Sequence, residues 1–376
     1  MEEYRLNHWK QKVLFTPGPL TTSMRVKQAM LRDVGSRDIE FIDTIAYIRQ
    51  KIKSVAGIDQ DKYEAILLQG SGTYSVEAVL ATASPPDAVW LVIQNGAYGV
   101  RIAKTLDKLK IKKIVRSYPE DSLPDLSEIS NTLESIPEIT HVAVIHCETT
   151  TGLINPIRQI GELAKKYGKI FFVDAMSSFG AVPVDFNSQL IDYLACCANK
   201  NFEGVPGFGF VIAKKDVLLN TEGNANSLVL DLYDQWKGFE RNGQFRFTPP
   251  THSILAFKQA LTELEEEGGI PARSARYRDN YETLVNGMRK LGFKEYLSPE
   301  LQGHIIVSFR YPEHPNFDFD SFYNLLNKRG YVIYPGKVSN ANCFRIGVCG
   351  RIFRSDILDL LNVIKDTIHE MDIELE

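Results

Sequence analysis

The stretch at residues 169–200, KIFFVDAMSSFGAVPVDFNSQLIDYLACCANK, contains two short apolar runs that each lead into a charged side chain. The runs KIFFVDA (169–175) and DYLACCA (192–198) have the length and composition of buried strands. Asp174 stands at the end of the first run, and Lys200 follows the second. Because ligands of open α/β sheets bind beyond the carboxyl ends of the strands, both residues are candidates for a functional site.

Similar runs recur on both sides of this stretch. Five more of them predict strands at residues 64–70, 88–94, 112–119, 140–148 and 207–213. Helical periodicity fills four of the connections, at residues 71–83, 98–109, 126–136 and 157–168. Strands that alternate with helices in this way predict an α/β fold with a mostly parallel sheet that is covered on both faces.

The rhythm changes after about residue 251. Helical stretches at residues 253–267, 277–291 and 354–371 are joined there by fewer strands and longer connections. A chain of 376 residues is long enough for two domains of unequal size. We therefore expect an N-terminal segment at 1–16, a large domain at 17–269 and a small C-terminal α/β domain at 270–376.

Composition narrows the class of protein. Hydrophobic residues make up 44% and charged residues 24%, as in an average globular protein, which excludes disorder, collagen and coiled coil. The net charge of −4 gives no general electrostatic reason to bind nucleic acid or an anionic membrane. The five cysteines include an adjacent pair and show no zinc-site spacing, so a reducing compartment fits better than a disulfide framework. With no apolar run for a signal peptide or a membrane span, we expect a cytoplasmic protein.

Four polar groups stand at the ends of predicted strands. Residues 69–73 (QGSGT) join a strand to a helix and suit an anion such as phosphate, although Ser71 as an ordinary helix N-cap explains them equally well. Residues 146–152 (HCETTTG) are rich in hydroxyl groups or simply form a polar loop. Asp174 needs a partner if it is buried, and an N-cap or a structural ion pair is the alternative. Lys200 suits a Schiff base, whereas most lysines are exposed.

Taken together, these groups favour one kind of site. Pyridoxal phosphate requires an anion site for its phosphate, a lysine for its aldehyde and a carboxylate that keeps the pyridine nitrogen protonated. The sequence places all three at one edge of the predicted sheet. No catalytic triad, metal site or dinucleotide fingerprint competes for the same residues.

The chain resembles a known family, the fold-type I, class V pyridoxal-phosphate aminotransferases. The similarity covers essentially the whole sequence, and the segments that carry it are LFTPGPLTTS (14–23), LLQGSGTYSVEAVL (67–80), QNGAYGVRI (94–102), HCETTTGLINP (146–156), FFVDAMSSFG (171–180), CCANKNFEGVPGFGFV (196–211), QFRFTPPTH (244–252) and FRIGVCG (344–350). The segments ANK…GVPGFGFV and FRFTPPTH resemble those of the family branch that acts on 2-aminoethylphosphonate and pyruvate. The resemblance implies a large domain with a mostly parallel seven-stranded sheet, a smaller C-terminal domain, and a homodimer with shared active sites.

The resemblance also implies roles for individual residues. Lys200 would form the internal aldimine with the cofactor and later shuttle the proton. Asp174 would pair with the pyridine nitrogen. Ser71, Gly72 and Thr73 would hold the phosphate.

Four further positions match the family pattern. Thr248 would reach the phosphate from the neighbouring subunit. Tyr98 would stack on the cofactor ring, and Thr149 would hydrogen-bond its phenolic oxygen. Arg345 would bind the anionic group of the substrate, since a guanidinium suits both carboxylate and phosphonate. Ordinary aromatic packing for Tyr98 and a structural ion pair for Arg345 remain the alternatives.

The implied reaction is a ping-pong transfer of the amino group of 2-aminoethylphosphonate to pyruvate, giving phosphonoacetaldehyde and L-alanine. Alanine–glyoxylate or serine–pyruvate transamination is the alternative, and Ser36 and Arg37 depart from the usual pattern in a segment that could border the substrate. A cysteine desulfurase would need a cysteine on a mobile loop, whereas Cys343 and Cys349 lie on or beside a predicted strand. The joint presence of Lys200 and Asp174 argues against an inactive relative.

Overall fold

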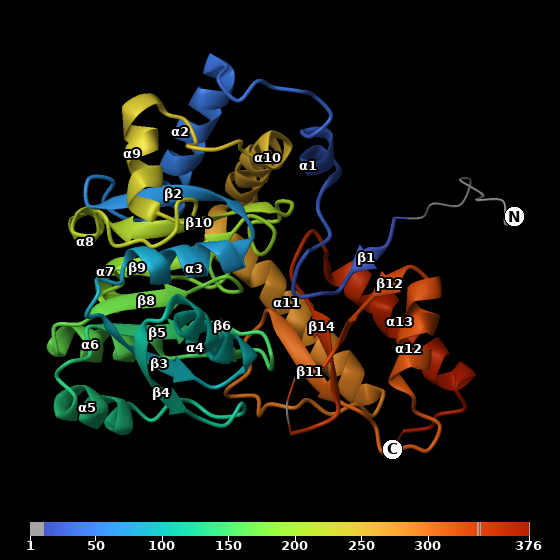
Figure 1. Cartoon of the computed structure of the whole chain (residues 1–376). Helices are drawn as coiled ribbons and strands as arrows, with labels where there is room; N and C mark the ends of the chain where they lie inside the picture. Colours follow the sequence, from blue (N-terminus) through green and yellow to red (C-terminus); the bar gives the residue numbers. More distant parts are fainter. Residues whose placement is uncertain (1–10, 337, 339, 376) are drawn as a thin grey trace, which may run out of the picture.

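The computed structural model describes residues 11–336, 338 and 340–375. A seven-stranded sheet with the strand order β2-β10-β9-β8-β5-β3-β4 forms its centre (Figure 1). The strands of this sheet are β2 (Tyr63–Gly70), β3 (Val89–Gln94), β4 (Lys112–Ser117), β5 (His141–Ile145), β8 (Ile170–Asp174), β9 (Tyr193–Cys197) and β10 (Gly207–Lys214). Each strand falls on one of the seven apolar runs of the sequence.

The sheet is mostly parallel, as predicted. Strands β4, β3, β5, β8 and β9 pair in parallel along the sheet. Strand β10 is antiparallel to both of its neighbours, β9 and β2. The carboxyl ends of the six parallel strands therefore meet at one edge of the sheet, where polar residues follow them.

Helices cover both faces of the sheet, because the connections run in two directions. Helix α3 (Gly72–Thr82) leads from β2 to β3, and α4 (Ala97–Leu109) leads from β3 to the edge strand β4. Helices α5 (Leu126–Ser135) and α6 (Ile157–Lys166) lead back toward β5 and β8. Right-handed crossovers in opposite directions place α3 and α4 on one face and α5 and α6 on the other.

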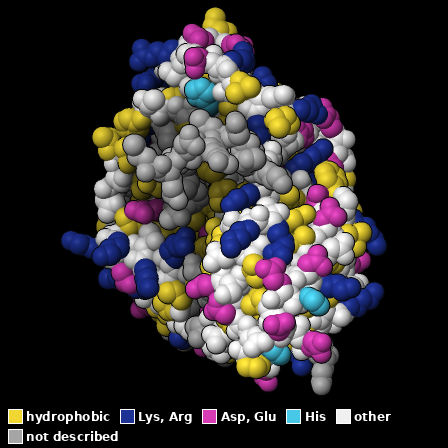
Figure 2. All heavy atoms as spheres, turned by 90° about the vertical axis from the view of Figure 1, so that its right-hand side faces the viewer, with side chains coloured by type: hydrophobic (Ala, Val, Ile, Leu, Met, Phe, Trp, Pro, Cys, Tyr) yellow, Lys and Arg dark blue, Asp and Glu magenta, His cyan; other side chains and the backbone are white. Residues whose placement is uncertain are grey.

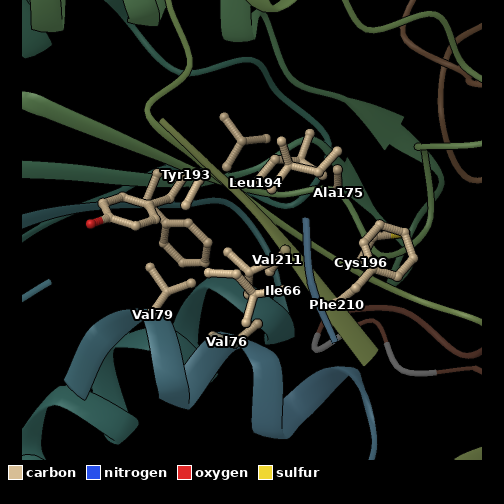
Figure 3. Packing of buried hydrophobic residues seen from close by; sticks show 14 of the residues in the cluster. Ile66, Val76, Val79, Ala175, Tyr193, Leu194, Cys196, Phe210 and Val211 are labelled. Carbon is tan, nitrogen blue, oxygen red and sulfur yellow. The ribbon is translucent and has the colours of Figure 1, made fainter. Parts of the chain in front are cut away.

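The apolar face of α3 fixes this helix on the sheet. Val76 and Val79 point from α3 toward Ile66 of β2 and Val211 of β10 (Figure 3). All four side chains are buried, and each contributes roughly 1.5–3 kcal/mol to the free energy of unfolding. The N-terminus of α3 is thereby held over the polar edge of the sheet.

Three longer helices lie at the β2 end of the sheet, namely α2 (Ile39–Val55), α9 (Leu232–Asn242) and α10 (Thr251–Glu267) (Figure 1). The sequence analysis predicted α10 but neither α2 nor α9. Short elements complete this part of the chain: α1 (Met24–Gln28), α7 (Phe186–Gln189), α8 (Lys215–Leu219), β6 (Cys147–Glu148) and β7 (Leu153–Ile154).

The C-terminal part is built on a three-stranded antiparallel sheet with the order β11-β14-β13. Its elements are α11 (Gly269–Lys290), β11 (Ile306–Arg310), α12 (Phe319–Lys328), β12 (Tyr331–Val332), β13 (Tyr334–Pro335), β14 (Cys343–Gly347) and α13 (Arg354–Glu370). Helix α11 begins at Gly269 and not at residue 277, because Pro271 lies in the first turn, where a missing N–H costs no hydrogen bond. Strand β1 (Val13–Leu14) pairs in parallel with β12, so the start of the described chain lies against this part.

Two clusters of buried apolar side chains support the expected domain division. The larger cluster draws its buried members from Val26 to Leu264, and the second draws them from Phe15 and from residues 284–373. We propose a boundary near residue 270, at the junction between α10 and α11. Most of the expected N-terminal segment, residues 1–10, lies outside the described residues, as does residue 376.

The surface of the C-terminal part carries charges of both signs. Figure 2 shows Lys and Arg side chains intermixed with Asp and Glu over the described part of this face. None of the helices in the described ranges combines the length and the apolar character that a bilayer crossing requires.

Candidate active site

A cavity of about 200 Å³ lies at the carboxyl ends of the parallel strands. Seven of the residues predicted from the sequence line it, namely Ser71, Gly72, Thr73, Tyr98, Thr149, Asp174 and Lys200. They come from five separate segments of the chain, and the sheet topology brings these segments together. Two predicted residues, Thr248 and Arg345, lie outside its wall.

Lys200 enters the cavity from the turn after β9. Its Nζ donates to the backbone carbonyl of Pro17 at 3.0 Å and to the Ser177 hydroxyl at 3.1 Å. Gly18, at a φ of +126°, passes so close that a Cβ there would lie 3.2 Å from Cγ of Lys200. The TPGP segment (16–19) therefore forms a backbone wall that holds the lysine, which explains why glycine is required in it.

Asp174 is buried at the end of β8, with 7% of its surface exposed. One of its carboxylate oxygens, Oδ1, accepts a hydrogen bond of 3.0 Å from the backbone N–H of Met176. Burial raises the pKa of Asp174 to about 6, although this N–H and the charges of Lys200 and Arg101 partly offset the effect. No ion pair satisfies this carboxylate among the described residues, so the alternative of a structural ion pair is wrong.

The N-terminus of α3 faces the same cavity. Ser71 is the N-cap residue, but its side chain makes no capping hydrogen bond, so the alternative of an ordinary N-cap serine is not supported. A Cβ on Gly72 would overlap Sδ of Met176, so a larger residue there would require the Met176 side chain to move. The first N–H groups of the helix and the hydroxyl of Thr73 are thus placed to bind an anion.

Glu148 is a buried carboxylate that the sequence analysis did not single out. Its oxygens accept hydrogen bonds from the backbone N–H groups of Tyr98 at 3.2 Å and Gly99 at 3.3 Å, and from the Thr150 hydroxyl at 2.9 Å. Complete burial raises the pKa of Glu148 to about 7. The carboxylate caps the start of α4 and so fixes the position of Tyr98. The sequence signal for this residue was an acid at a strand end followed by threonines.

Arg345 lies behind the cavity wall and is connected to it. Its guanidinium donates from Nη1 to the carbonyl of Thr149 at 2.8 Å and from Nε to the carbonyl of Pro335 at 3.0 Å. Burial lowers the pKa of Arg345, and contacts with Tyr98 and Tyr334 oppose this effect. No carboxylate forms an ion pair with it in the described ranges, so the alternative of a structural ion pair is wrong here too.

Thr248 is placed on a separate hollow beside the cavity. Its carbonyl accepts a hydrogen bond of 3.2 Å from Nε2 of Gln69, and the hollow is also lined by Tyr74 and Phe247. Within one chain Thr248 does not reach the cavity that Ser71 lines. A contact with a phosphate would therefore have to be made in another subunit.

All five cysteines are buried. Burial raises the pKa of Cys343 to about 11 and that of Cys349 to about 12, so neither provides a thiolate nucleophile on an exposed loop. Cys147 and Cys197 line the cavity as small apolar groups. This arrangement does not favour the desulfurase alternative.

Comparisons with known proteins agree with this geometry. Residues 21–347 match the family model described as aminotransferase class V. The chain belongs to this family. A 2-aminoethylphosphonate–pyruvate transaminase of Vibrio vulnificus (strain CMCP6) is 51% identical over 95% of this chain and 98% of the relative. One of the same name from Bacillus cereus (strain Q1) is 49% identical over 95% of this chain and 97% of the relative.

Solved structures support the fold. Ureidoglycine–glyoxylate aminotransferase from Bacillus subtilis superimposes with a TM-score of 0.90 at 21% identity, over 99% of this chain and 96% of that one. Pyridoxamine–pyruvate aminotransferase from Mesorhizobium loti gives 0.89 at 22% identity, over 98% and 95%. The fold is that of the fold-type I aminotransferases, as the resemblance implied.

The cofactor of this family is pyridoxal phosphate, and the residues of the cavity fit it. The cavity offers a lysine amine, a helix N-terminus for a phosphate and a buried carboxylate that forms no ion pair with any described residue. The unbalanced carboxylate of Asp174 is the most specific of these features, because a protonated pyridine nitrogen supplies the positive charge that it lacks.

Proposed function

We propose that this protein transfers the amino group of 2-aminoethylphosphonate to pyruvate, which yields phosphonoacetaldehyde and L-alanine. The observation that carries the proposal is the identity of about half of all residues, over 95% of the chain, with relatives named for this reaction. The donor set of the cavity and the nearby guanidinium of Arg345 are consistent with it.

Lys200 is proposed as the residue that bonds to the cofactor and moves the proton. Its Nζ lies in the cavity with Asp174, and the amine is held by one backbone carbonyl and one hydroxyl. With its amine free, Nζ would take a proton from the substrate carbon next to nitrogen and later return one. The hydrogen bonds to Pro17 and Ser177 hold this amine in the cavity.

Asp174 and the N-terminus of α3 hold the two ends of the cofactor in this proposal. Bound pyridoxal phosphate supplies an aldehyde and a ring that withdraws electrons. The carboxylate of Asp174 keeps a positive charge on the ring nitrogen, and Ser71, Gly72 and Thr73 bind the phosphate. Tyr98 and Thr149 would contact the ring and its phenolic oxygen, and the burial of Thr149 and Asp174 keeps water from that end of the cavity.

Arg345 is proposed to bind the anionic group of each substrate in turn. Its hydrogen bonds to the backbone carbonyls of Thr149 and Pro335 use Nη1 and Nε, and the guanidinium also has a hydrogen bond with the Tyr98 side chain. A planar guanidinium suits phosphonate and carboxylate alike. Because one site takes both substrates in succession, we expect ping-pong kinetics.

We further propose a homodimer with shared active sites. Tyr74, Val229 and Phe247 are large apolar residues that are exposed beside the hollow in which Thr248 lies. Such a patch is typical of an interface, and a partner there would bring its own Thr248 close to the cavity. Light scattering tests the dimer: a monomer at micromolar concentration would contradict it. A cytoplasmic location is also proposed from the unpaired cysteines.

A panel of substrate pairs tests the reaction. The cofactor-loaded enzyme is assayed with 2-aminoethylphosphonate and pyruvate, with L-alanine and glyoxylate, and with L-serine and pyruvate. The proposal expects the highest kcat/KM for the first pair. A higher value for either amino acid pair would leave the cofactor chemistry intact and replace the substrate.

A further inference from the structure

Arg101 lies on the wall of the cofactor cavity without a role in the account above. It is an exposed residue of α4, one turn after Tyr98, and it lines the same cavity as Ser71, Gly72 and Thr73. The sequence analysis quoted its segment, QNGAYGVRI, but assigned it no function. Its position at the mouth of the cavity makes it accessible to a ligand.

Two contacts fix the guanidinium of Arg101. Its Nη1 donates to the Thr73 hydroxyl at 3.4 Å, and its Cζ lies 4.7 Å from the ring centroid of Tyr98. The aromatic contact orients the plane of the guanidinium, and the hydroxyl contact places it at the N-terminus of α3. Since no carboxylate pairs with Arg101 among the residues that the structure describes, most of its N–H donors are left for a ligand.

The charges on the cavity wall show what Arg101 could supply. The charged residues that line the cavity are Asp174, Lys200 and Arg101. Lys200 is used to bond the aldehyde, and Asp174 carries a negative charge toward the ring nitrogen. Without Arg101, the positive charge that faces the dianionic phosphate would come from the helix terminus alone, and it amounts to about half an elementary charge. Arg101 is the cation that remains.

We propose that Arg101 binds the phosphate group of pyridoxal phosphate, together with the N-terminus of α3 and Thr73. This inference rests on the site roles proposed above. The guanidinium adds a full positive charge and fork-shaped donors, which suit a phosphate better than a single hydroxyl does. Arg345 is thereby left for the substrate anion, and the Tyr98 side chain interacts with both guanidinium groups.

Equilibrium binding to the cofactor-free enzyme tests this proposal. Apoenzyme is titrated with pyridoxal phosphate and separately with pyridoxal, which lacks the phosphate, and the absorbance of the bound aldehyde is followed. For Arg101→Gln the expected result is a Kd for pyridoxal phosphate that rises roughly ten- to hundredfold, the factor for the loss of a hydrogen-bonded charge pair. The Kd for pyridoxal should stay within about twofold of wild type, because Arg101 has no other group to bind.

Lys104→Gln is the matched control, since Lys104 is an exposed cation one turn further along α4 that does not line the cofactor cavity. It should leave both constants unchanged. An unchanged Kd for pyridoxal phosphate in Arg101→Gln would overturn the proposal, as would an equal rise for both aldehydes. A raised KM for 2-aminoethylphosphonate with an unchanged cofactor Kd would assign Arg101 to the substrate instead. Failure of the wild type to bind pyridoxal phosphate would refute the proposed function itself.

Discussion

The guanidinium of Arg345 donates to the backbone carbonyl of Thr149 across 2.8 Å, and this hydrogen bond joins residues 196 positions apart in the chain. Thr149 lines the cofactor cavity, whereas Arg345 belongs to β14 of the C-terminal part. The proposed substrate anion site and the proposed cofactor site are therefore held together by a direct contact between the two parts of the molecule.

Arg345→Lys should separate substrate binding from cofactor binding. A lysine keeps the charge but loses the fork of donors that reaches both Thr149 and a substrate anion. We expect the KM values for 2-aminoethylphosphonate and for pyruvate to rise together, roughly tenfold or more, with an unchanged Kd for pyridoxal phosphate. Steady-state kinetics and cofactor titration measure the two effects. A rise for one substrate alone would mean that the two anions do not share this residue.

Asp174→Asn should change the pH dependence of the cofactor-free protein. The pKa of Asp174 in the folded state is raised to about 6, above its value in the unfolded chain. The folded state therefore holds the proton more tightly, and the free energy of unfolding falls as the pH rises from about 4 to 6. The full effect amounts to roughly 3 kcal/mol for this rise in pKa. Bound cofactor should reduce it, because the ring nitrogen then pairs with the carboxylate.

Denaturant unfolding of wild type and Asp174→Asn between pH 4 and 7 measures this effect. We expect the wild type to lose stability relative to the variant over this range, because asparagine does not ionise. The charge of Asp174 raises the pKa of Glu148, so the titration of Glu148 also differs between the two proteins and adds to the measured difference. A constant difference at all pH values would show that Asp174 is not held in an environment that disfavours its charge.

Glu148→Gln should weaken the start of α4. The carboxamide presents an NH₂ group where the carboxylate accepts from the N–H groups of Tyr98 and Gly99. We expect a loss of about 1–3 kcal/mol in the free energy of unfolding, because a buried donor is left unsatisfied. Glu162→Gln, an exposed residue of α6 paired only with Arg158, should change stability by less than about 0.5 kcal/mol. Equal stability of Glu148→Gln and wild type would remove the capping role.

Tyr277→Phe should loosen the contact between the Lys200 turn and the C-terminal part. The Tyr277 hydroxyl donates to Oε1 of Glu203 at 2.7 Å and accepts from the N–H of Gly350 at 2.8 Å. Loss of the hydroxyl removes one hydrogen bond from the buried Glu203 carboxylate and one from the Gly350 N–H. This should lower the free energy of unfolding by about 1–3 kcal/mol.

Tyr281→Phe, on the same helix, is the control for that variant, because no hydrogen bond of its hydroxyl is recorded among the described residues. It should behave as wild type within about 0.5 kcal/mol in chemical denaturation. Similar losses for both variants would indicate a general sensitivity of α11 and not a specific role of Tyr277.

Much of the sheet could be predicted from the sequence, because six of its seven strands are apolar runs typical of buried strands, whereas the edge strand β4 is only partly buried and carries charged residues. Asp174 and Lys200 could be identified for the same reason, since charged residues at the ends of such runs are costly without a function. Helices α2 and α9 were missed, although α2 buries Phe41, Ile45 and Ile48. In the sequence these residues stand outside the strand–helix alternation that guided the prediction.

The remaining parts of the site depend on contacts between distant segments, which a single sequence does not contain. Its place at a strand end, before three threonines, marks Glu148 in the sequence, but the sequence does not indicate that it caps a helix that starts about 50 residues earlier. The contact of Arg101 with Thr73 likewise depends on how α3 and α4 pack side by side. The resemblance supplied Arg345 as a candidate, but only the structure connects it to Thr149.

Lys200→Ala should lower turnover by roughly 10³-fold or more, because one amine both bonds the cofactor and moves the proton. The fold should persist, since the Lys200 amine makes only two hydrogen bonds to the described residues. Circular dichroism and the melting temperature check the fold. Appreciable residual transamination by a well-folded variant would remove Lys200 from the mechanism.

The amino-donor half-reaction tests the central claim most directly. Wild-type enzyme loaded with pyridoxal phosphate is mixed with 2-aminoethylphosphonate in the absence of any keto acid, and the absorbance of the aldehyde form of the cofactor is followed. L-Alanine, L-serine and glycine are run beside it. The account predicts rapid conversion to the amine form with the phosphonate and with L-alanine, and little with L-serine or glycine. Conversion by the amino acids but not by 2-aminoethylphosphonate would contradict it.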